Sequence, residues 1–172
     1  MNIRKKRDEV DSEKKANTAF FTGDNRINKS SIDYLAQKLA KTIETLTKQG
    51  VIYYGCGSVE GFDWLAVSAV LSARKNNPSI KLILVLPSQN NDNRWNGADK
   101  HTFRAALENA DKVVYMSERY VNDCIQKRNL HLIKHSGVCV AYVKLATGDT
   151  AKIVGLAREN GLKIVNLAEG SY

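Results

Sequence analysis

Apolar residues along this chain gather in short continuous runs that alternate with longer amphipathic stretches. The clearest run, residues 81–86, is apolar after its first lysine, which is typical of a strand covered on both faces of a parallel sheet. Similar runs rich in β-branched or aromatic residues predict further strands at 18–21, 51–54, 113–115, 138–143 and 164–167. Apolar positions three or four residues apart predict helices over 32–46, about 62–76, 103–110, about 121–135 and 153–157.

Alternating strands and helices predict an α/β protein, a three-layer sandwich with helices on both faces of a mostly parallel sheet. The chain has 172 residues and no internal repeat, so we expect one domain over residues 18–172. Residues 1–17 are polar and contain the basic run Arg4-Lys5-Lys6-Arg7, followed by four acidic residues and two lysines. We expect this segment to be a solvated, flexible N-terminal arm, with nucleic-acid binding as the alternative.

The composition narrows the class of protein. Hydrophobic residues make up 43% of the chain and charged residues 26%, as in ordinary soluble globular proteins. Three widely spaced cysteines argue against a disulfide framework and a zinc site. No apolar run reaches the roughly 18 residues of a membrane span, and no secretory signal is evident, so we expect a cytoplasmic protein without a membrane partner. The net charge of +8 favours anionic ligands such as nucleotides or nucleic acid.

The segment 51–67 has the pattern most typical of a binding site. A predicted strand runs into Gly55 and Gly57, and Gly61 precedes the apolar spacing of a helix. This order directs backbone N–H groups toward an anion, and glycine fits where a ligand approaches the backbone closely. The alternative is a plain strand-to-helix turn whose glycines allow tight packing. The spacing matches neither the dinucleotide G-x-G-x-x-G pattern nor a Walker loop.

Four loops follow the ends of predicted strands: residues 22–26, 55–61, 87–97 and 147–150. Ligands of parallel sheets bind outside the carboxyl ends of the strands, so these loops are expected to share one crevice. Arg26 in the first loop suits bidentate binding of phosphate or carboxylate, the alternative being an exposed loop arginine.

Two charged side chains interrupt apolar patterns. Arg128 stands where the helical stripe of Val121, Cys124 and Leu132 requires an apolar residue. A buried guanidinium needs a partner, which is either a protein carboxylate or the anion of a ligand. Asp63 lies in the first turn of its helix, where it either caps free N–H groups or contacts a ligand hydroxyl.

Two aromatic features leave alternatives open. Trp95 lies in a polar loop, where it either stacks on a base or covers the edge of the core. His131 and His135 are four residues apart on a predicted helix, but no third ligand accompanies them, so no metal site is predicted.

Two motifs, Phe20-Phe21-Thr22-Gly23 with Arg26 and Gly57-x-x-x-Gly61-Phe62-Asp63-x-x-Ala66, resemble the SLOG superfamily. This Rossmann-like group contains the cytokinin-activating LOG proteins and the DNA-processing protein DprA. Later motifs occur in the order of its YpsA-like branch: Leu86-Pro87, Gln89, Trp95, Ala110-Asp111, Tyr120, Arg128-Asn129 and Gly148-x-Thr150. The resemblance covers residues 18 to 168 and implies a Rossmann-like fold.

The chain also departs from the superfamily's patterns. Asp24 and Asn25 stand where the YpsA-like branch has a single histidine, and only one glycine precedes Thr150. Ile153 occupies the position of the glutamate that LOG enzymes use, so the resemblance does not imply LOG-type phosphoribohydrolase chemistry.

The resemblance implies a sensor or regulatory protein that binds a nucleotide or an ADP-ribose-like ligand, with no further cofactor. The alternatives are an enzyme that cleaves an N-glycosidic bond in such a ligand, with Asp63, Glu60 and Asp149 as candidate groups, and a protein that binds single-stranded DNA. A homo-oligomer is compatible with each of these. The residues expected to bind the ligand are Thr22, Gly23, Arg26, Gly55, Gly57, Ser58, Gly61, Asp63, Trp95, Arg128, Gly148 and Thr150.

Overall fold

The strands of the computed structural model are β1 (Thr18–Gly23), β2 (Tyr53–Cys56), β3 (Lys81–Leu86), β4 (Lys112–Tyr115), β5 (Val138–Tyr142) and β6 (Lys163–Asn166). They form one sheet in the order β4-β3-β2-β1-β5-β6, and every pairing is parallel. The α/β class with a mostly parallel sheet is therefore confirmed. The structure describes residues 3–58, 60–90 and 98–168.

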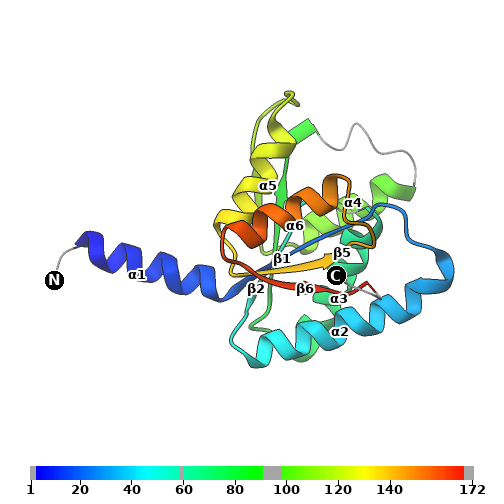
Figure 1. Ribbon diagram of the computed structural model, residues 1–172, viewed down its shortest axis with the longest axis horizontal. Helices are drawn as coiled ribbons and strands as arrows, with labels where there is room; N and C mark the ends of the chain where they lie inside the picture. Colours follow the sequence, from blue (N-terminus) through cyan, green and yellow to red (C-terminus); the bar gives the residue numbers. More distant parts are fainter. Residues whose placement is uncertain (1–2, 59, 91–97, 169–172) are drawn as a thin grey trace.

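Helices cover both faces of this sheet, as Figure 1 shows. The helices are α1 (Ile3–Ala16), α2 (Ile32–Lys48), α3 (Gly61–Asn76), α4 (Ala98–Asn109), α5 (Cys124–Lys134) and α6 (Asp149–Glu159), with a short 3-10 turn, η1 (Lys29–Ser31), before α2. Side chains of α2, α3 and α4 share one hydrophobic cluster with the sheet, and side chains of α5 and α6 share a second one. The sheet lies between the two clusters. Adjacent side chains of β1 therefore point to opposite faces, with Phe21 in the first cluster and Phe20 in the second.

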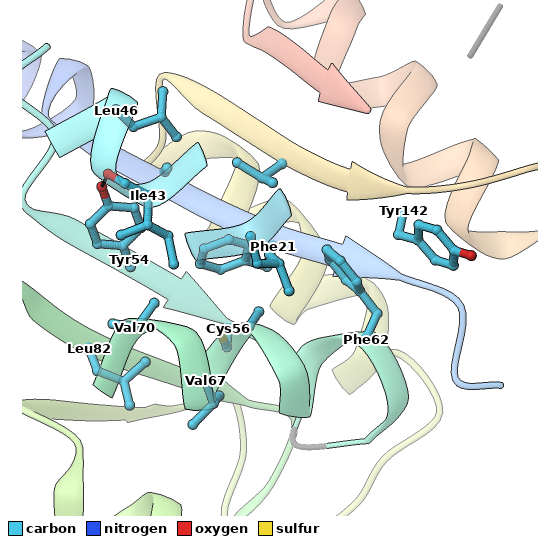
Figure 2. Packing of buried hydrophobic residues seen from close by; sticks show 14 of the residues in the cluster. Phe21, Ile43, Leu46, Tyr54, Cys56, Phe62, Val67, Val70, Leu82 and Tyr142 are labelled. Carbon is cyan, nitrogen blue, oxygen red and sulfur yellow. Dashed lines mark hydrogen bonds between the residues drawn. The ribbon is translucent and has the colours of Figure 1, made fainter. Parts of the chain in front are cut away.

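The larger cluster contains a row of aromatic rings (Figure 2). Phe21 stacks on Tyr54 with 5.9 Å between the ring centroids, and Phe62 stacks on Tyr142 at 5.7 Å. The buried Tyr54 hydroxyl donates to the carbonyl of Ile43 at 3.1 Å, so its polar end is satisfied. This row extends to the carboxyl edge of the sheet, where Phe62 lies in the first turn of α3.

The N-terminal arm is helical rather than flexible. Residues 3–16 form α1, which projects away from the sheet in Figure 1. Its last turn is fixed to the domain, because the Asn17 carbonyl accepts the N–H groups of Ile52 and Tyr53 at 3.0 and 3.1 Å. Since β1 begins immediately after α1, the helix leaves from the amino edge of the sheet, opposite the strand ends where ligands of such folds bind. The division of the chain at residue 17 stays a prediction.

The observed ends of several elements differ from the predicted ones, and two of these differences concern elements that carry candidate site residues. The strand expected at 51–54 lies at Tyr53–Cys56, because Gly55 pairs with Phe20 of β1 and with Ile83 of β3. Gly55 is thus a strand residue and not part of the loop. The helix expected from residue 121 begins at Cys124, and Val121 is 43% exposed instead of facing the core.

Candidate functional site

The strand order reverses between β1 and β5, and the loops predicted to meet there do leave the same edge of the sheet. From β1 the chain proceeds to β2, β3 and β4 on one side, and β5 and β6 lie on the other. In folds of this kind the crevice outside such a reversal is where ligands bind. The loops after β1, β2 and β5 all begin at this edge.

On the α3 side, the glycine that ends β1 makes room for an aromatic ring. A Cβ on Gly23 would lie 2.4 Å from the ring of Phe62, which packs between Phe21 and Tyr142. Thr22 beside it is 9% exposed. The absence of a side chain at Gly23 is therefore explained by core packing.

Gly61 is required by the backbone of a neighbouring loop. Its φ is +51°, and a Cβ there would lie 2.3 Å from the carbonyl oxygen of Asn25. The Phe62 N–H donates to the Asp24 carbonyl at 3.3 Å, so the loop after β1 lies against the start of α3. This contact supports the simpler interpretation of Gly61, as a residue needed for tight packing.

Gly57 makes room for an arginine from the opposite layer. A Cβ on Gly57 would lie 2.9 Å from Nε of Arg128, which reaches over from α5. Arg128 donates to the Gly57 carbonyl at 3.0 Å and, through Nε and a terminal nitrogen, to Oδ1 of Asn129 at 3.1 and 2.8 Å. The sequence predicted that Arg128 pairs with a protein carboxylate or with the anion of a ligand. In the structure its hydrogen bonds include one to a backbone carbonyl, which was not among these alternatives.

Asp63 is the most perturbed acidic group described at this edge. Its Oδ1 is shielded from solvent and has no hydrogen-bond partner among the residues that the structure describes. Burial raises the pKa of this carboxyl to about 7, against the opposing effects of the Arg128 charge and of hydrogen bonds from Ser58. The residue at the N-cap of α3 is Glu60, one turn earlier, and it makes no side-chain cap bond. A carboxyl that titrates near neutral pH and lacks a full set of partners is a candidate for ligand contact.

Cys56 lies at the end of β2 in the same surroundings. It is fully buried, and burial together with the nearby Asp63 carboxylate raises the pKa of its thiol well above the ordinary value. The thiol is thus neutral at physiological pH and is not an activated nucleophile.

The remaining expected residues are Arg26, Gly148, Thr150 and Trp95. Arg26 is exposed in the loop after β1. Gly148 has a φ of +102° at the N-cap of α6, and a Cβ there would meet nothing within 4 Å. Thr150 is half-buried in the first turn of α6. Trp95 lies outside the described residues.

Comparison with known proteins decides the family. The model described as the YspA SLOG family matches residues 14–158. The chain belongs to this family. It is also 27% identical over 141 residues, 74% of this chain and 82% of the relative, to the protein named Uncharacterized SPbeta prophage-derived protein YoqJ of Bacillus subtilis (strain 168).

Solved structures support the Rossmann-like fold of this SLOG chain. DNA processing protein A from Helicobacter pylori matches 91% of the chain and 67% of its own length, with a TM-score of 0.62 and 14% identity. DprA from Streptococcus pneumoniae matches 90% of the chain at a TM-score of 0.64 and 15% identity. This chain spans about half of the Streptococcus protein, 51%. At such identities the likeness concerns the fold.

The SLOG chain also has a residue at this edge that the sequence did not single out. Ser88, two residues after β3, is 0% exposed, and its Oγ has no hydrogen-bond partner among the described residues. A serine after a strand-ending proline resembles an ordinary loop residue, so its burial was not predictable from the local pattern.

His131 and His135 contact each other, as their spacing on one helix predicts. The rings of His131 and His135 stack with 4.1 Å between centroids, and Nδ1 of His135 lies 2.8 Å from the His131 carbonyl oxygen. Burial, His135 and two lysines lower the pKa of His131. Within the described ranges, no group of three or more histidine, cysteine, aspartate or glutamate side chains is placed to hold a metal ion. Nor is any helix of the described residues long and apolar enough to cross a membrane.

Proposed function

We propose that this SLOG protein binds a nucleotide-type ligand at the carboxyl edge of its sheet and acts as a sensor or regulatory protein. The observation that carries the proposal is the Asp63 carboxyl, whose shielded Oδ1 lacks a partner among the described residues, close to the Arg128 cation and the loop after β2. A buried acceptor without a donor is costly, and a ligand hydroxyl or amino group would remove that cost.

The charges at this edge suit two different parts of such a ligand, an anionic group and a hydrogen-bond donor. The side chain of Arg26 and the N–H groups at the start of α6, around Gly148 and Thr150, favour an anion. Asp63 repels an anion and favours a donor, such as a ribose hydroxyl. A nucleotide or an ADP-ribose-like molecule carries both groups within one compact ligand.

A thermal-shift screen with AMP, ADP-ribose and NAD tests the proposal, with inorganic phosphate as the control for a bare anion. A ligand present at 100 times its dissociation constant stabilises the folded protein by about 2.7 kcal/mol. Arg26→Ala should weaken binding of the best ligand by about 1–3 kcal/mol, as for a lost charged hydrogen bond. Arg158→Ala, an exposed arginine in the last turn of α6, is the matched control and should bind normally. The proposal is wrong if none of the three nucleotides shifts the transition.

An N-glycosidic-bond-cleaving enzyme is the second candidate, and the raised pKa of Asp63 favours it. A carboxyl with a pKa of about 7 is protonated in a substantial fraction of molecules near neutral pH and can act as a general acid. Glu60 and Asp149 are exposed, and Ile153 packs against the core where LOG enzymes have glutamate. Release of free base from AMP at roughly 1 per second or faster would favour this candidate over a sensor.

A further inference from the structure

Ser88 has a buried hydroxyl that nothing in the described structure satisfies. The residue is 0% exposed, and its Oγ makes no hydrogen bond to any residue that the structure describes. Leaving a buried polar group without a partner is energetically costly, and such groups in native proteins call for an explanation. The surrounding strand end gives no reason for a hydroxyl there, since Leu84 and Leu86 are core residues.

A second unsatisfied oxygen, Oδ1 of Asp63, lies at the same edge. Within the described residues, Ser88 Oγ and Asp63 Oδ1 are the buried side-chain oxygen or nitrogen atoms without a partner. They follow neighbouring strands, because β2 and β3 pair in parallel with Cys56 opposite Leu84.

Both residues are connected to the hydrophobic cluster that the sheet shares with α3. Leu82, Leu84 and Leu86 of β3 belong to this cluster, and Ser88 comes two residues after Leu86, beyond Pro87. Asp63 is in the first turn of α3 and is close enough to Cys56 to raise the pKa of its thiol. The chain thus brings one donor-capable and one acceptor oxygen to the same edge of the sheet.

We propose that Ser88 and Asp63 form a subsite for one hydroxyl group of the ligand's sugar, which rests on the proposed nucleotide binding. A carboxylate only accepts hydrogen bonds, whereas a serine hydroxyl can donate one. A ligand hydroxyl placed between them donates to Asp63 and accepts from Ser88, so both oxygens are satisfied. A phosphate there would face the carboxylate, and an apolar group would leave both oxygens unsatisfied.

Calorimetric titration of the full chain with AMP, 2′-deoxy-AMP and 3′-deoxy-AMP tests the subsite, with ADP-ribose as a further probe. We expect the parent to bind one of the two deoxy analogues about tenfold more weakly than AMP, on the order of one lost hydrogen bond. Ser88→Ala should weaken AMP and ADP-ribose by a similar factor and remove the difference between AMP and that analogue. Ser136→Ala is the matched control, because Ser136 is also buried, at 1% exposed, but lies before β5 at the opposite edge.

The outcomes separate the subsite from the function on which it rests. If the parent binds AMP or ADP-ribose and Ser88→Ala binds them equally well, the subsite is wrong and the proposed function stands. An ordered water would then be the partner of both oxygens. Binding of both deoxy analogues as tightly as AMP by the parent would overturn the subsite in the same way. If the parent binds none of AMP, ADP-ribose and NAD, the proposed function and the subsite fall together.

Discussion

The Asp63 carboxyl makes the stability of the folded protein depend on pH. Its pKa is raised from the ordinary value of 3.8 to about 7, chiefly by burial, and Arg128 limits the increase. The folded protein therefore keeps a proton between these pH values that the unfolded chain has lost. The contribution to stability is full below pH 3.8 and falls by about 1.4 kcal/mol per pH unit as the pH rises toward 7, and then stays constant.

Asp63→Asn should remove this dependence, because an amide does not titrate. We expect the variant to gain free energy of unfolding relative to the parent as the pH rises from 5 to 7, and to keep that gain at pH 8. Urea unfolding at four pH values measures it. Asp149→Asn, at a fully exposed carboxylate in the first turn of α6, is the control and should follow the parent. Parallel stability curves for Asp63→Asn and the parent would contradict the raised pKa of the Asp63 carboxyl.

Sequence patterns predicted single residues unevenly. Arg128 interrupts an apolar stripe, so its need for a partner was predictable. The partner itself was not, since the Gly57 carbonyl lies 71 residues away and a backbone oxygen has no sequence signature. For Gly57 and Gly61 the sequence left packing and ligand approach open, and the nearest atoms that a Cβ would meet belong to Arg128 in the first case and to the Asn25 backbone in the second.

At the scale of elements, the join between the β1 loop and α3 depends on a single glycine. Gly61→Ala adds a Cβ at positive φ and against the backbone of Asn25, which cannot rotate away as a side chain can. We expect a loss of roughly 2–4 kcal/mol in the free energy of unfolding, from backbone strain and displacement of the loop. Denaturant unfolding at pH 7 measures this loss.

Gly155→Ala is the control for this substitution. Gly155 lies within α6, and a Cβ there would meet nothing within 4 Å. Alanine should therefore stabilise the helix by about 0.5–1 kcal/mol. Equal stabilities of Gly61→Ala and the parent would show that the loop after β1 does not lie against α3.

Elements with strong periodicity were predicted well, and their ends less well. The strand predicted at residues 81–86 matches β3, because a run of apolar residues bounded by prolines has few other interpretations. β2 extends past the predicted end into Gly55 and Cys56, since pairing with its two neighbours outweighs the low strand propensity of glycine. The polar composition of α1 suggested flexibility, yet a polar sequence is also compatible with an exposed helix.

At the scale of the whole molecule, the alternation of elements was enough to predict the α/β layers. The strand order required the structure, because local sequence does not say on which side of β1 the later strands pair. That order places β5 beside β1, and hence the loop carrying Gly148 at the same edge as Asp63 and Arg26. The candidate crevice is thus a consequence of topology, whereas its two unsatisfied oxygens follow from packing.

The charge distribution bears on nucleic-acid binding, because DNA processing protein A of Helicobacter pylori, which shares this fold, binds single-stranded DNA. Of the net charge of +8, the first 17 residues carry only +2, from six basic and four acidic side chains, but four of the basic residues are consecutive. Because α1 leaves from the amino edge of the sheet, a contact between DNA and this run would be separate from the candidate crevice at the carboxyl edge.

We therefore predict that single-stranded DNA is not the main partner of this protein. Replacing Arg4, Lys5, Lys6 and Arg7 together by glutamine should remove most of any weak DNA binding and leave the affinity for AMP unchanged. Fluorescence anisotropy with a labelled oligonucleotide at about 50 and 200 mM salt measures the first effect, since phosphate contacts weaken steeply as salt rises. Tight, salt-sensitive DNA binding that survives the fourfold substitution would place DNA on the domain itself. Competition between AMP and the oligonucleotide would then decide whether the DNA site coincides with the candidate crevice.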